Sequence, residues 1–221
     1  MQGRRYVAVM ALGGMGKEAA PFAGAIARLL SDGVRSEAAK ALGKINATGD
    51  DLGLELVLLL HSNDNEVRHE SLVSLGRMGE HGVSFAKDVL PLLDDSDRGV
   101  RDAAADALGP FGEAGGGLAK DVATLLTSEK PLVRSGAIQA LGKMGQSGAD
   151  FAGVVAASLK DSDLNVRFAA LEALGCMGKA SAPYTERIFV LLDDKVENGR
   201  NAAFQALGAL GKVGVPVAAK I

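Results

Sequence analysis

Two hydrophobic patterns alternate along the chain, and both have the spacing of α-helices. In the first, small or apolar residues stand at the third, fourth, sixth and seventh places after an arginine, as in the segment following Arg101. In the second, apolar residues stand at i, i+4, i+7 and i+8, as in Phe85, Val89, Leu92 and Leu93. Each spacing gathers the apolar side chains on one face of a helix. The sequence therefore predicts an all-α fold built from pairs of amphipathic helices.

The helix pairs repeat every 33 residues. The period is marked by six arginines in register, Arg35, Arg68, Arg101, Arg134, Arg167 and Arg200. Arg5 extends the series if three residues are missing from the loop 31–33. Ankyrin repeats have the same period, but their Thr-Pro-Leu-His turn is absent here. We expect a single solenoid over residues 1–221, with about six and a half repeats starting near residues 5, 35, 68, 101, 134, 167 and 200.

Glycines, prolines and acidic loops fit this architecture. One glycine near the end of each first helix should let the second helix approach closely: Gly13, Gly43, Gly76, Gly109, Gly142, Gly175 and Gly208. A second series should end the first helices in a left-handed cap: Gly16, Gly79, Gly112, Gly145, Gly178 and Gly211. The loops 94–97 and 161–163 supply N-cap oxygens. Pro91 falls late in a second helix, where it removes the hydrogen bond to the Lys87 carbonyl and should bend the helix.

Composition and charge exclude several classes of partner. The chain has 24 basic and 27 acidic residues, a formal net charge of −3, and no broad positive field for a phosphate backbone, so we expect no nucleic-acid partner. No apolar run near the start is long enough for a signal peptide or a membrane span, so we expect no membrane partner. Cys176 is the single cysteine, which excludes an internal disulfide and favours a cytoplasmic protein.

The motif Val-Arg-x-x-Ala-x-x-Ala-Leu-Gly, around Arg35, Arg101, Arg134 and Arg167, resembles the short HEAT repeats of phycobilisome lyases and many scaffold proteins. The resemblance covers essentially the whole chain. It implies a right-handed superhelix of antiparallel helix pairs, with first helices on the convex side and second helices on the concave side, where partners bind. It also implies that each arginine pairs with an acidic residue near the repeat junction. With Asp64, Asp97 and Asp163 nearby, this is favoured over a basic stripe for an anionic ligand.

Candidate catalytic residues are few. His69-Glu70 resembles the histidine-glutamate pairs of deoxyhypusine hydroxylase, an iron enzyme built from the same kind of repeat, but the equivalent places here hold no second pair. Cys176 has no histidine near it in sequence, and the aromatic and basic groove of HEAT-like DNA glycosylases has no match. We therefore expect no catalytic residues, no cofactor and no metal site. The alternative is a subunit of a chromophore (bilin) lyase or another HEAT-repeat enzyme, because such subunits carry few diagnostic residues.

The expected function is a non-catalytic scaffold that binds an unidentified protein or peptide in a groove formed by the second helices. The second-helix positions outside the apolar stripe should point into this groove. Leu54 and Leu58, one helical turn apart, would form an apolar patch there. The alternative is that this leucine-rich helix is rotated or more deeply buried. The predicted site residues are Leu54, Leu58, Lys87, Asp88, Lys120, Asp121, Glu186 and Arg187.

The first and last repeats lack polar caps. Tyr6 and Met10 occupy first-helix places that are polar in other repeats, and the last repeat stops at Ile221, early in its second half. Solenoids normally end in polar repeats. The sequence therefore predicts either a fragment of a longer array or end-to-end self-association.

Overall fold

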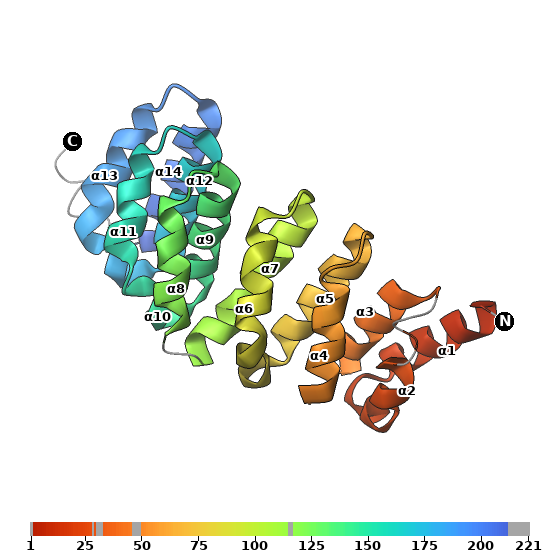
Figure 1. Ribbon diagram of the computed structural model, residues 1–221. Coiled ribbons are helices and arrows are strands. Elements are labelled where there is room, and N and C mark those ends of the chain that lie inside the picture. Colours follow the sequence, from red (N-terminus) through yellow and green to blue (C-terminus); the bar gives the residue numbers. More distant parts are fainter. Residues whose placement is uncertain (1, 28, 30–32, 46–49, 115–116, 212–221) are drawn as a thin grey trace. The chain divides into compact units, whose positions relative to one another are not determined.

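The computed structural model describes residues 2–27, 29, 33–45, 50–114 and 117–211 (Figure 1). All regular elements among these residues are α-helices or short 3-10 helices, and none is a strand. The predicted all-α fold is therefore confirmed. The chain divides into two compact units, Met1–Ala114 (unit 1) and Gly115–Ile221 (unit 2). The expectation of one continuous solenoid over residues 1–221 stays a prediction.

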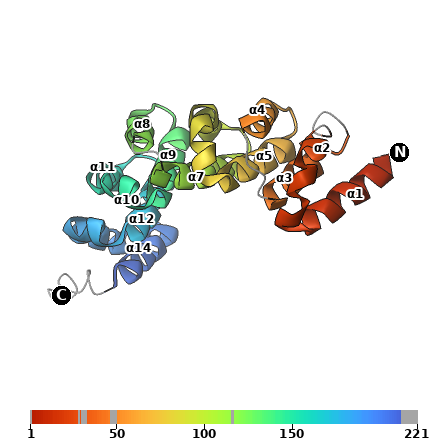
Figure 2. The ribbon, with the colours of Figure 1, turned by 90° about the horizontal axis from the view of Figure 1, so that it is seen from below.

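In unit 1, each first helix packs on the next first helix. These are α1 (Gln2–Gly14), α3 (Arg35–Ile45), α5 (Asn65–Arg77) and α7 (Arg98–Ala114). The second helices are η1 (Gly16–Phe22) with α2 (Ala23–Ala27), α4 (Asp50–Leu59), and η3 (Gly79–Phe85) with α6 (Ala86–Val89) and η4 (Leu90–Asp94). In Figure 2, α2 and α4 lie on one side of the row formed by α3 and α5.

Unit 2 repeats the arrangement. Its first helices are α9 (Pro131–Lys143), α12 (Leu164–Cys176) and α14 (Glu197–Leu210), and they pack in that order. The second helices are α8 (Leu118–Thr124) with η5 (Leu125–Thr127), α10 (Gly145–Ala149) with α11 (Ala152–Ala157) and η6 (Ser158–Lys160), and η7 (Gly178–Tyr184) with α13 (Thr185–Val190) and η8 (Leu191–Asp193). Within both units, the core lies between the first-helix row and the second helices and is dominated by alanine, leucine and valine.

The glycines late in the first helices allow neighbouring first helices to approach each other. A Cβ atom added at Gly76 would lie 2.9 Å from the Cα of Ala107, and one added at Gly142 would lie 2.9 Å from the Cα of Ala173. The sequence-based prediction named the second helix as the neighbour, and it is wrong. The apolar stripe shows which face of a helix is buried but not which helix covers it, and here the first helix of the next repeat does so.

The capping glycines behave as predicted in every described repeat but one. Gly16, Gly79, Gly145, Gly178 and Gly211 all have φ between 53° and 59°, the left-handed region in which glycine ends a helix without strain. Gly112 is the exception, because α7 continues through it to Ala114. The reason is the residue before it. Before the other capping glycines stands a methionine or, in the last repeat, Leu210, whereas this repeat has Phe111, whose fully buried ring fills the space beside Gly82 and holds the helix end in the core.

Pro91 shortens its helix. The α-helical part α6 ends at Val89, and the chain continues as the 3-10 helix η4 with Pro91 in its first turn. In unit 2, the equivalent helix α8 remains α-helical to Thr124, two repeat places further on. Proline cannot donate a hydrogen bond to the Lys87 carbonyl, so the α-helical hydrogen bonding stops earlier. The structure thus shows a change of helix type at Pro91, while the predicted bend stays a prediction.

Candidate partner-binding surface

Leu54 and Leu58 form an exposed apolar pair on α4, which we call the α4 patch. Their exposed fractions are 57% and 66%, and they lie one helical turn apart. The other face of the same helix is in the core, where Leu56 is 1% exposed and Leu60, just after the helix, is 2% exposed. The alternative of a rotated or more deeply buried helix is therefore wrong.

The charged residues predicted for this part of the groove lie on the neighbouring second helix of unit 1. Lys87 and Asp88 are exposed on α6. Just before them, the ring of Phe85 lies directly against Gly53 of α4, in space that any larger residue would fill. This contact holds the start of α6 against α4, so the α4 patch has a lysine and an aspartate on the adjoining helix.

In unit 2, the four remaining predicted residues are also exposed. Lys120 and Asp121 lie on α8, and Glu186 and Arg187 lie on α13. The Arg187 guanidinium lies 5.5 Å from the centroid of the Tyr184 ring, a cation–π distance. That the eight residues of the two units bind one partner stays a prediction.

Two exposed valines in unit 2 are not among the predicted site residues. Val154 on α11 is 47% exposed, and Val190 on α13 is 70% exposed. Val190 occupies the same repeat place as Leu58, so the repeat register already assigns it to the groove face. The repeat place of Val154 holds charged residues in other repeats, Glu55, Asp88, Asp121 and Arg187.

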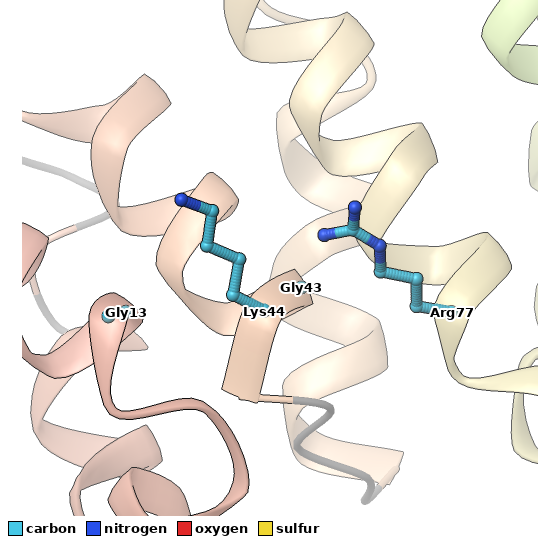
Figure 3. A pocket seen from close by; sticks show the side chains of 5 residues that line it. Gly13, Gly43, Lys44 and Arg77 are labelled. Carbon is cyan, nitrogen blue, oxygen red and sulfur yellow. The ribbon is translucent and has the colours of Figure 1, made fainter.

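An open hollow of about 500 Å³ lies at the ends of the first helices of unit 1 (Figure 3). Its walls are three glycines of α1 and α3, and two cations, Lys44 and Arg77, extend over it. Both cations belong to the last turns of their helices, where a positive charge is stabilised by the helix macrodipole. A helix-terminal role explains both residues, and the hollow contains no predicted site residue.

The arginines form a structural ladder. Arg68 donates two hydrogen bonds of 2.8 Å to the carboxylate of Asp95, and Arg134 donates two of 2.8 Å to that of Asp161. Such bidentate pairs are strong and directional. Arg167 lies 3.9 Å from Asp194 at the equivalent places. The predicted pairing is confirmed for these arginines but is wrong for Arg101, which donates to the backbone carbonyls of Asp95 and Ser96 because Ser128 stands at the place of the aspartate. The side chain of Arg35 lies outside the described residues.

The acidic partners are not the ones expected from the sequence. Asp64 and Asp163 cap helices instead, since the first accepts from one backbone N–H group and the second from two at the start of the next first helix. Asp97 accepts from the Val100 amide and from the Asn65 side chain. The ion pairs are formed by the aspartates two places earlier in the loop. The capping role predicted for these loops is confirmed.

The ladder aspartates are held in their charged form. The hydrogen bonds from Arg134 lower the pKa of Asp161 below its ordinary value and outweigh the effect of burial. For Asp95, burial favours the neutral carboxyl, yet the hydrogen bonds from Arg68 and the Asp97 amide lower its pKa overall. The same contacts raise the pKa values of Arg68 and Arg134. Two arginines of the row are therefore neutralised in place.

His69 and Glu70 join two neighbouring repeats. The Glu70 carboxylate is largely buried and lies 3.5 Å from Lys40 of α3 and 3.6 Å from Nδ1 of His69. Among the described residues, no group of three or more histidine, cysteine, aspartate or glutamate side chains is placed to hold a metal ion. Cys176 is exposed at the end of α12. These contacts give the histidine–glutamate pair a structural role between α3 and α5.

Comparison with known proteins shows which kind of helical repeat the chain contains. Residues 86–175 match the family model described as HEAT repeats. An engineered protein solved by the Northeast Structural Genomics Consortium aligns with a TM-score of 0.52 and 22% identity, covering 92% of this chain and 63% of that chain. A second engineered protein from the same consortium aligns with a TM-score of 0.50 and 18% identity, covering 86% of this chain and 98% of that one. No curated protein matches the chain.

Residues 86–175 thus consist of HEAT-like repeats, and the described residues have an all-α helical repeat fold. A designed armadillo repeat protein in complex with the peptide (KR)4 is also similar, at 18% identity over 84% of this chain and 98% of that one, but with a TM-score of only 0.45. That peptide is a property of the designed protein. Over the residues that the structure describes, no helix has both the length and the apolar character needed to cross a membrane.

Proposed function

We propose that this chain is a non-catalytic scaffold that binds a partner protein or peptide on its second helices, with the α4 patch at the centre of the binding surface. The observation that supports this most is the exposure of Leu54 and Leu58, at 57% and 66%, on a helix whose other face carries the buried Leu56. Single exposed apolar residues are common on protein surfaces. Two leucines on one stripe, one turn apart, create a contiguous apolar surface that a partner can cover.

The surroundings of the patch match the composition of an interface. Protein interfaces combine an apolar centre with a polar rim. Here Lys87 and Asp88, with opposite charges, lie exposed on the helix adjoining the patch. A partner segment with apolar residues at helical or extended spacing and charges of both signs would fit this surface. Because each leucine is already partly covered, burying the rest of it would contribute about 1–2 kcal/mol of binding free energy before the cost of ordering the partner.

The proposal needs no chemistry from the chain. The arginines donate to carboxylates and carbonyls of the repeat junctions, and Glu70 lies against Lys40 and His69. These groups serve the fold, which leaves the outward side chains of the second helices for contacts with a partner.

The test uses peptides selected from a random phage-displayed library on the immobilised wild-type chain. We expect selected peptides to lose more than about tenfold in affinity for the double variant Leu54→Asp with Leu58→Asp, as measured by isothermal titration calorimetry. The matched control is Val154→Asp with Val190→Asp, which places the same charges at exposed apolar positions of unit 2. Circular dichroism and urea unfolding verify that both variants fold.

Two outcomes would overturn the proposal. One is that the library yields no binding peptide. The other is that the selected peptides bind the Leu54/Leu58 variant as tightly as the wild type. Peptides that lose affinity only for the Val154/Val190 variant would place the binding surface on unit 2 instead.

A further inference from the structure

An apolar stripe on α1 lies uncovered. It consists of Val7 and Ala11, both exposed, with Val7 at 65%. Tyr6 and Met10 flank it with exposed fractions of 45% and 41%. In α7 and α12, which pack on the preceding first helices α5 and α9, the places of Val7 and Ala11 are buried. These buried equivalents are Ala103, Ala107, Ala169 and Ala173, each no more than 3% exposed.

A second uncovered stripe lies on α14. Phe204 is 73% exposed, and Gly208, one turn later, is exposed as well. The place of Phe204 is part of the core in every earlier repeat. Its equivalents are Val9, Ala39, Leu72, Ala105, Ile138 and Leu171, none more than 1% exposed. Phe204 is thus a large aromatic side chain at a core position with little of the core around it.

The two stripes are the two halves of the junction that joins first helices within each unit. In that junction, a glycine of one helix faces an alanine of the next, as Gly76 faces Ala107 and Gly142 faces Ala173. By repeat place, Gly208 is the equivalent of Gly142, and Ala11 is the equivalent of Ala173. One end of the repeat series thus presents the glycine half and the other presents the alanine half.

Gly208 has no local reason to be glycine. No described atom lies within 4 Å of a Cβ atom added there, so an alanine would fit. Glycine within a helix is less favourable than alanine because it restricts the unfolded chain less. The glycines at the equivalent places are explained by a neighbouring helix at close range. A neighbour on α14 would explain Gly208 in the same way.

We propose that a second copy of this chain covers these stripes, with α14 of one copy packed on α1 of the next and Gly208 opposite Ala11. The two surfaces differ, so the contact is heterologous and joins copies head to tail. Repetition of such a contact forms an open chain of molecules or, if the rotation closes, a ring. The argument rests on continuity with the first-helix junctions inside the two units and is independent of the proposed partner surface.

The test blocks the α1 stripe and the α14 stripe separately. Ala11→Arg disables the α1 stripe and leaves α14 intact, whereas Gly208→Arg does the reverse. In sedimentation velocity from low micromolar to submillimolar concentration, the wild type should show a rising average mass. Each variant alone should remain monomeric, and a mixture of the two should form one-to-one dimers and nothing larger, because only one productive contact can form.

The outcomes separate the alternatives. A wild type that stays monomeric at every concentration would overturn the proposal and indicate that another segment covers the stripes. Variants that associate as the wild type does would indicate a different surface. If Gly208→Arg alone formed dimers, the α1 stripe would pair with itself. Val7→Asp and Phe204→Ser provide a second pair of blocks, because both side chains are exposed and their replacement leaves the core intact.

Discussion

Arg134 and Asp161, 27 residues apart, are joined by two parallel hydrogen bonds of 2.8 Å. The same guanidinium donates a third hydrogen bond of 2.8 Å to the carbonyl of Ser128, six residues before it. One side chain therefore connects the loop that precedes its own first helix with the loop that precedes the next first helix, α12. Arg68 makes the same three contacts, with Asp95 and with the Ser62 carbonyl.

Replacing Arg134 with lysine should lower the free energy of unfolding by about 1–3 kcal/mol, because a lysine cannot form the bidentate pair and leaves its partners incompletely satisfied. The side chains of Arg134 and Asp161 are each only 14% exposed, so water replaces the lost bonds poorly. Urea unfolding measures the change. Arg98→Lys is the control, since its ion pair with Asp102 is largely exposed, with side-chain exposed fractions of 85% and 47%. Equal effects of the two substitutions would contradict the structural role of the ladder.

Stability should depend on pH through Asp161. Its pKa in the folded protein is lowered by the hydrogen bonds from Arg134, so folding favours the charged form. The resulting stabilisation is fully present above the unfolded pKa of about 3.9 and is lost as the pH falls through the lower folded pKa. Asp161→Asn removes this dependence. The difference in unfolding free energy between the wild type and this variant should be largest near neutral pH and should shrink below about pH 4. A difference that stayed constant over this range would show that the charge of Asp161 contributes nothing.

A methyl group at Gly142 should destabilise unit 2. The added Cβ would lie 2.9 Å from the Cα of Ala173, a contact that forces α9 and α12 apart. Such overpacking typically costs about 1–3 kcal/mol. Gly208→Ala in α14 is a matched control at the same repeat place, and it should be neutral or stabilising by up to about 1 kcal/mol in the monomer. Thermal unfolding at low protein concentration distinguishes the two variants, and a stabilised Gly142→Ala would refute the close packing described here.

Replacing Pro91 with alanine should lengthen α6. The new amide can donate to the Lys87 carbonyl, and the site is exposed, so the α-helix should extend toward residue 91, as it does in the equivalent helix α8. Backbone carbon chemical shifts at residues 88–92 report the change. Shifts that kept their 3-10 values would mean that the following residues, rather than Pro91, determine where the α-helix ends.

The fold was predictable from the sequence because one pattern is repeated many times. Arginines 33 residues apart, capping glycines and acidic loops each recur, so a local interpretation at one repeat is supported by the others. The error over Gly76 and Gly142 has a different origin. A stripe of small residues predicts a close approach, but the neighbour is chosen by the packing of whole helices, which no single stripe encodes.

The candidate site was harder to predict. The segment 54–60 is almost entirely apolar, so its pattern could not show whether Leu54 and Leu58 lie in the core or in solvent, and only the packing of Leu56 and Leu60 decides it. Phe111 similarly extended α7 past a glycine that ends the helix in other repeats. In both cases the outcome depends on neighbours that are distant in sequence.

The sequence distances that the arginine hydrogen bonds span also determine how the length of this protein can change. Because Arg134 bonds six residues back and 27 residues forward, its contacts span 33 residues, the same distance as the period. A gene duplication or deletion of one whole period keeps every arginine at the same distance from the loops before and after it, whereas a change of any other length separates donors from acceptors. The chain can therefore gain or lose repeats in evolution, or by design, without new junction chemistry, and its length is adjustable in steps of one helix pair.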